Sequence, residues 1–155
     1  MFFKNILFGM LILNVLSGKA QDDFISLNEI TINDITVLGE NNNYLIQNFG
    51  DPNVIENYFF EMEDVQGEIY NYDGLLFYLI DDKIVSFEIR NSIYNFTSNN
   101  IRVGSNISSL QNVYPISYEN RGEGHLGLNI TNCDCFITII CDESGVIELI
   151  SHTEP

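Results

Sequence analysis

The chain has 155 residues, 45% of them hydrophobic, and carries 22 Asp and Glu against six Lys and Arg, for a formal net charge of −16. This much apolar material can form a core, which excludes a chain that is disordered throughout. The shortage of cations argues against binding to nucleic acid or to an anionic membrane surface, because phosphate recognition relies on clustered Lys and Arg.

Residues 1–20 have the pattern of a secretory signal peptide. Lys4 supplies a positive n-region, Ile6 to Leu16 is an apolar run, and Gly18-Lys19-Ala20 offers small residues at a cleavage site. The run is too short to span a hydrocarbon core of ~30 Å as a helix, and no cysteine follows it to accept a lipid. We therefore expect cleavage after Ala20. The mature protein would then be exported, periplasmic or secreted, with no lipid anchor and no transmembrane helix.

After an N-terminal segment at 21–34, residues 35–100 predict a first unit of one helix and three strands. Asn41 can cap a helix of two or three turns, which Gly50 and Pro52 end. Asp73-Gly74 is a strong hairpin signal between two strands. The elements expected in this unit are a short strand at 35–37, the helix before Gly50, a linker, and strands at 68–72, 75–80 and 84–90.

Residues 101–155 predict a second unit with the same order of elements, in which Ser105 can cap a helix that Pro115 ends. At a spacing of 65, Gly39 matches Gly104 and Leu45 matches Leu110; at a spacing of 60, Ile80 matches Ile140. The shared order of strand, glycine, helix, proline and strands favours an internal duplication. The expected fold is α+β: two tandem helix-plus-three-strand antiparallel meander repeats, with the helices packed on one face of the sheet.

One run of residues resembles a known group of exported proteins. A short helix that ends in Gly-x-Pro precedes Gly74-Leu75-Leu76-Phe77, and Lys83 to Phe87 then reads KIVSF. This pattern is similar to that of the β-lactamase-inhibitory-protein-like repeat domains and the small outer-membrane assembly lipoproteins. The resemblance implies helical segments packed on antiparallel strands and a function in binding other proteins. The chain departs from the lipoproteins because it lacks their lipid-acceptor cysteine.

Aromatic residues in the first unit are the candidate binding surface. Tyr and Phe beside polar residues are common at protein interfaces, and acids such as Glu61 and Glu63 could rim them. Any of these aromatic residues could instead face the core. The candidates are Tyr58, Phe59, Phe60, Tyr70, Tyr72 and Tyr78.

Three cysteines and a histidine in the second unit are the candidate chemical groups. A bridge from Cys133 to Cys135 spans one residue, and Cys135 and Cys141 would lie roughly 20 Å apart on one strand. A bridge within either of these pairs is therefore not expected, which leaves a cross-link to another molecule or three reduced, mostly buried thiols. The thiols are favoured because a free cysteine packs as a small hydrophobic residue. Together with His125 the three cysteines are also weak candidates for a metal site, although a single Cys-x-Cys lacks the second pair of a typical zinc site.

The sequence contains no phosphate loop, dinucleotide fingerprint or Gly-x-Ser-x-Gly nucleophile motif. We expect an exported, acidic protein-binding or scaffold module without catalytic activity or cofactor, whose partner is another exported protein. The alternative is a thiol- or metal-dependent enzyme, or a metal-binding protein, that uses Cys133, Cys135, Cys141 and His125.

Overall fold

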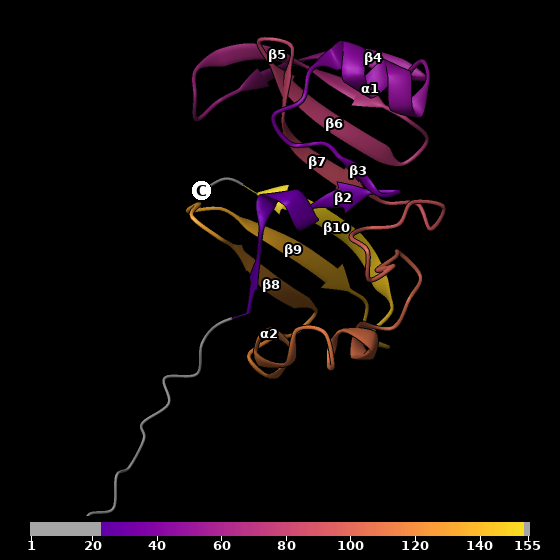
Figure 1. Ribbon diagram of the computed structural model, residues 1–155, viewed down its shortest axis with the longest axis vertical. Coiled ribbons are helices and arrows are strands. Elements are labelled where there is room, and N and C mark those ends of the chain that lie inside the picture. The colour runs from indigo at the N-terminus through magenta and orange to yellow at the C-terminus, as the bar shows by residue number, and fades with distance from the viewer. Residues whose placement is uncertain (1–22, 154–155) are drawn as a thin grey trace, which may run out of the picture.

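A computed structural model describes residues 23–153, and the signal peptide predicted at 1–20 lies outside them. Eight strands form one mixed sheet in the order β1-β8-β9-β10-β7-β6-β5-β4, and β2 and β3 form a separate pair (Figure 1). In chain order the elements are β1 (Phe24–Ile25), η1 (Leu27–Glu29), β2 (Thr31–Ile32), β3 (Ile35–Thr36), α1 (Asn42–Phe49), β4 (Val54–Phe60), β5 (Val65–Asn71), β6 (Leu75–Ile80), β7 (Lys83–Ile89), η2 (Ile107–Leu110), α2 (Pro115–Glu119), β8 (His125–Ile130), β9 (Phe136–Cys141) and β10 (Ile147–Thr153).

The predicted α+β fold with two helix-plus-three-strand repeats is wrong. The described residues are mostly β-structure with two α-helices, of which α1 has eight residues and α2 only five. The supposed linker before residue 61 is the seven-residue strand β4, because Val, Ile, Tyr and Phe fit a pleated sheet. The helix expected after Ser105 is the short 3-10 segment η2. The first group of strands thus has four members and the second has three.

Strand pairing in the large sheet is antiparallel except between β1 and β8. Strands β4 to β7 follow one another as a meander, and so do β8 to β10. The two meanders meet where β10 pairs with β7, with Ile150 opposite Ile89 and Ser151 opposite Glu88. By contrast, six residue pairs join β10 to β9. The seam between the two meanders is therefore short.

Two glycines with positive φ tie loops to the inner strands. Gly39 (φ 79°) donates its N–H to the carbonyl of Ile84 on β7, at 2.8 Å. Gly104 (φ 87°) makes the corresponding bond to Ile147 on β10, at 2.7 Å. These left-handed conformations favour glycine. Each loop thereby fixes the chain that precedes α1 or η2 against its meander.

One continuous core joins both meanders. Phe77, Phe87 and Phe96 are fully buried in it, and α1 contributes Phe49, whose ring lies 5.4 Å from that of Phe77. Successive residues of a strand point to opposite faces. The face of β6 and β7 that carries Phe77 and Phe87 is therefore the one covered by α1. The neighbouring residues Tyr78 and Glu88 point to the opposite face.

Candidate functional site

Three aromatic side chains meet on the sheet face away from α1. The rings of Tyr58 and Phe60 on β4 lie 4.9 Å apart, and that of Tyr78 on β6 lies 5.6 Å from Tyr58 and 6.5 Å from Phe60. All three contacts are edge-to-face, the geometry that aromatic quadrupoles prefer. The intervening strand β5 provides Gly67 opposite Tyr58. Because Gly67 has no side chain, the Phe60 ring can lie directly against its backbone.

These rings form one wall of a cleft of about 290 Å³, which we call the aromatic cleft. The cleft runs from β4 across β6 and β7 to the end of β10. Glu63 and Glu88 line it and make its charge negative. The lining residues are Tyr58, Phe60, Glu63, Tyr78, Ile80, Val85, Ser86, Glu88, Ser151 and His152.

The two cleft carboxylates differ in their partners. Arg90 donates from Nε to Glu88 at 2.8 Å and forms an ion pair with the same oxygen. Burial, followed by the nearby charge of Glu88 and a hydrogen bond to it, raises the pKa of Tyr78 to about 12. Tyr78 is therefore protonated at neutral pH and can donate to Glu88. Within 23–153, Glu63 is in no ion pair, so its charge is available to a ligand.

The aromatic candidates from the sequence separate into two groups. Tyr58, Phe60 and Tyr78 line the cleft. Tyr70 and Tyr72 are each 5% exposed and belong to the core, where Tyr72 packs beside Phe49. Phe59 is 44% exposed but points to the other face of β4. Half of the predicted set therefore shares one surface.

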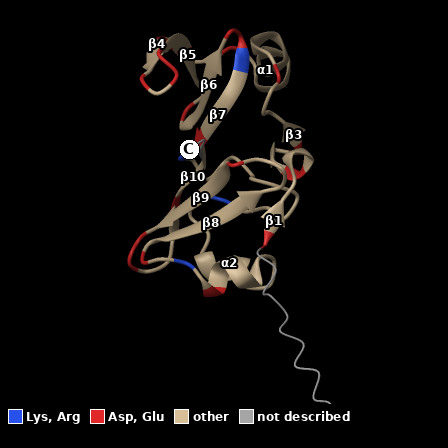
Figure 2. Ribbon diagram, turned by 90° about the vertical axis from the view of Figure 1, so that its left-hand side faces the viewer, with Lys and Arg blue, Asp and Glu red and all other residues tan. Residues whose placement is uncertain are grey.

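Acidic residues lie in two of the turns that join the strands of the first meander. Figure 2 shows red segments in the loop between β4 and β5 and at the turn between β6 and β7. Lys83, the first residue of β7, follows that second turn. The β4–β5 loop contains Glu61, Glu63 and Asp64 and borders the aromatic cleft through Glu63.

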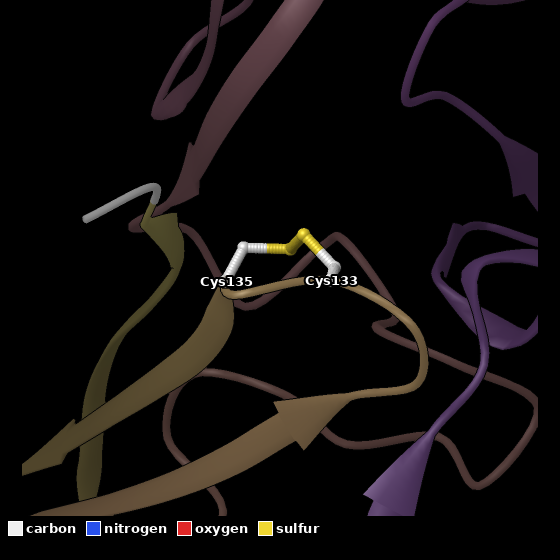
Figure 3. Close-up of a disulfide and its surroundings, with 2 residues drawn as sticks. All are labelled: Cys133 and Cys135. Carbon is white, nitrogen blue, oxygen red and sulfur yellow. A yellow bond between two sulfur atoms is a disulfide. The ribbon is translucent and has the colours of Figure 1, made fainter.

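The predicted cluster of Cys133, Cys135, Cys141 and His125 is not assembled. Cys133 and Cys135 form a disulfide in the turn between β8 and β9 (Figure 3), whereas Cys141 is a free thiol at the other end of β9. His125 begins β8 and pairs with Ile140, close to the Cys141 end. No group of three or more His, Cys, Asp and Glu among residues 23–153 is placed to hold a metal ion.

The preference for three reduced thiols is also wrong. The turn brings the Cα atoms of Cys133 and Cys135 to 5.1 Å, inside the usual disulfide range of about 4.4–6.8 Å. Cys133 is exposed and Cys135 is 5% exposed. No local pattern in the sequence indicates a turn of that shape between the two residues.

Sequence reasoning missed His152. It is 5% exposed on β10 and stacks on Phe87, with ring centroids 6.1 Å apart. Its buried Nδ1 has no hydrogen-bond partner among the described residues. Burial lowers its pKa more than a hydrogen bond with the backbone of Val85 raises it. The sequence could have indicated that His152 is buried, because side chains alternate along a strand and His152 therefore lies on the same side as Ile150.

Comparison with known proteins identifies a shared fold and no family. No protein-family model matches the chain, and no curated protein matches it significantly. A crystal structure of an extracellular protein containing an SCP domain, from Bacillus anthracis str. Ames, superposes with a TM-score of 0.55 at 14% identity. The match covers 76% of this chain but only 44% of that protein, so the chain spans less than half of its length. No helix within 23–153 is long and apolar enough to cross a membrane.

Proposed function

We propose that the protein is an exported binding module whose aromatic cleft holds a Lys or Arg side chain of another exported protein. The observation that carries the proposal is the cleft itself, in which three aromatic rings and a carboxylate without an ion-pair partner among the described residues share one uncovered face of the sheet. Export rests on the pattern of residues 1–20, and the extracellular structural neighbour is consistent with it.

The chemistry of the cleft favours a cation. Rings of Tyr and Phe attract an ammonium or guanidinium group by about 0.5–2 kcal/mol, depending on its desolvation. Glu63 adds an opposite charge at the rim. A net charge of −16 draws basic segments toward the protein from a distance. An anionic ligand would meet Glu63 and Glu88 without a free cation in the cleft lining.

Strand β4 offers a second element of the same surface. Within the described part of the chain it pairs with β5 on one side only, so its other edge has unpaired backbone groups. Val54 and Ile55 are 46% and 50% exposed there. An extended partner segment can add to such an edge through backbone hydrogen bonds, while its side chains provide specificity. A partner strand along β4 would place a side chain at Tyr58 and Phe60.

The test uses a short peptide with one central Arg between Gly and Ser residues, and the same peptide with Glu in place of Arg. Titration by fluorescence anisotropy should show binding of the Arg peptide that weakens as salt is raised. Tyr58→Ala should reduce the affinity about tenfold, equivalent to ~1.4 kcal/mol. Glu63→Gln should reduce both the affinity and its dependence on salt.

Matched controls come from the same strand and loop. Phe59→Ala removes an equally exposed ring from the opposite face of β4, and Glu61→Gln removes a neighbouring charge that does not line the cleft. Both variants should bind as the wild type does. Equal binding of the Arg and Glu peptides, or equal losses in the Tyr58 and Phe59 variants, would refute the proposal.

A further inference from the structure

The seam between the two meanders opens beyond Ser151. Past that residue, β10 and β7 are no longer paired residue by residue. His152 contacts β7 through three interactions: its carbonyl accepts from the Ser86 hydroxyl at 2.7 Å, its ring has a hydrogen bond with the backbone of Val85, and the same ring stacks on Phe87. A second cavity of about 510 Å³, here called the seam cavity, lies beside this opening. His152 and Val85 line both the seam cavity and the aromatic cleft. The seam cavity also contains Cys133, Cys135 and Lys83 in its wall.

The disulfide in this wall joins no distant elements of the fold. Cys133 and Cys135 are two residues apart in one turn, and the stabilisation from cross-linking an unfolded chain is smallest for the shortest loops. The two sulfur atoms also differ in access, because Cys133 is exposed and Cys135 is buried. A bridge with one accessible sulfur and little structural purpose is a candidate for thiol–disulfide exchange.

We propose that the Cys133–Cys135 disulfide oxidises dithiols of other exported proteins. A substrate thiolate attacks Sγ of Cys133, the bridge breaks, and Sγ of Cys135 leaves with the electron pair as a thiolate. The second substrate thiol, once deprotonated, attacks the substrate sulfur of the mixed disulfide and releases Cys133 as a thiolate. The two protons from the substrate end on the two cysteines. The substrate has lost two electrons and this protein has gained them.

Two residues that line the seam cavity, Lys83 and His152, can stabilise the Cys135 sulfur after the bridge breaks. The positive charge of Lys83 favours a thiolate over a thiol. His152 lines the same cavity, and its unpartnered Nδ1 is available to accept a hydrogen bond from the thiol that reduction creates. Asp134 lies between the cysteines but is exposed and does not line the cavity. We assign Lys83 and His152 as positioning residues for Cys135.

The experiment is a stoichiometric reaction of the oxidised protein with dithiothreitol, in a Cys141→Ser background that removes the third thiol. Samples are alkylated at intervals and the free cysteines are located by peptide mass spectrometry. Two thiols should appear, at Cys133 and Cys135, for each dithiothreitol oxidised, while circular dichroism remains that of the folded protein. A bridge that resists reduction until the protein unfolds would overturn the proposal.

Single-cysteine variants test the assigned order of attack. In the same background, Cys135→Ser leaves the exposed thiol, which should form a mixed disulfide with oxidised glutathione. Cys133→Ser leaves the buried thiol, which should react at least tenfold more slowly. Lys83→Gln should slow reduction of the intact bridge, whereas Arg102→Gln, an exposed cation outside the cavity, should not. Equal reactivity of the two single thiols, or an unchanged rate in Lys83→Gln, would contradict the mechanism.

Discussion

Gly67 provides the sharpest test of the sheet beneath the aromatic cleft. A Cβ at this position would lie 2.2 Å from the backbone oxygen of Leu79 and 2.5 Å from Cε2 of Phe60. The Phe60 ring could turn away, but the Leu79 oxygen belongs to β6 and moves only with its strand. Overpacking of this kind costs about 1–3 kcal/mol. We therefore expect Gly67→Ala to destabilise the fold by that amount and to disturb the cleft.

Gly127→Ala is the matched control. Gly127 also lies in a strand and has no positive φ, and a Cβ at this position would have no other atom within 4 Å. Alanine there should be neutral or stabilise by roughly 0.4–1 kcal/mol, because it reduces the freedom of the unfolded chain. Urea denaturation should separate the two variants by about 1–4 kcal/mol, the sum of the two effects. Equal stabilities would show that β5 does not approach β6 as described.

Three further predictions concern other parts of the fold. Because burial lowers the pKa of His152 below its ordinary 6.5, the unfolded chain binds more protons, and the free energy of unfolding should fall as the pH drops below about 6.5. Urea melts between about pH 5 and 7.5 should show a smaller fall in His152→Phe but not in His125→Gln, a change at an exposed site. Asn41 accepts from the backbone N–H of Tyr44 at 2.9 Å, so Asn41→Ala should cost about 1 kcal/mol in the same assay, and Asn41→Asp much less. Phe96→Ala should lower stability by about 3–5 kcal/mol through an unfilled core site, whereas Phe24→Ala, at a half-exposed ring, should change it little.

Local signals in the sequence identified the hairpins of the first meander. Asp73 and Gly74 both have positive φ (54° and 86°), as a tight hairpin turn requires. The strands predicted on either side correspond to β5 and β6, and the alternation after Lys83 corresponds to β7. These features depend on residues that are close together in the sequence. The parallel contact of β1 with β8, and the seam between β7 and β10, join segments far apart in the chain, and no local pattern specifies them.

The predicted fold class was wrong because the capping signals for helices did not show how short those helices would be. Ser105 and Pro115 bracket a segment that could be a helix, but it forms η2 and the separate, short α2. Short helices depend on packing for their stability, and the sequence does not report what they pack against. Conversely, β4 is exposed along nearly its whole length, so no alternation of apolar and polar residues marked it as a strand.

Only half of the predicted aromatic residues line the aromatic cleft, because they were chosen by residue type and not by the face of the strand on which each lies. Tyr58 and Phe60 share a face of β4, and Phe59 between them does not. Tyr70 on β5 and Tyr72, the first residue after that strand, are both buried, and the register with β6 puts Tyr70 opposite the buried Phe77. The register between β5 and β6 would have indicated that both tyrosines face the core. It would not have indicated that β4 pairs with β5.

The two proposed activities can be tested independently because the sheet separates them. Ser151 lies opposite Glu88 and faces the aromatic cleft, so His152 points to the other side, where Cys135 is buried. A partner held by its cation at Tyr58 is therefore on the wrong face to deliver a thiol to Cys133. Tyr58→Ala should leave the rate of disulfide reduction unchanged, and Cys133→Ser should leave peptide affinity unchanged. If either substitution altered both properties, Val85 and His152, which line both cavities, would have to transmit the effect.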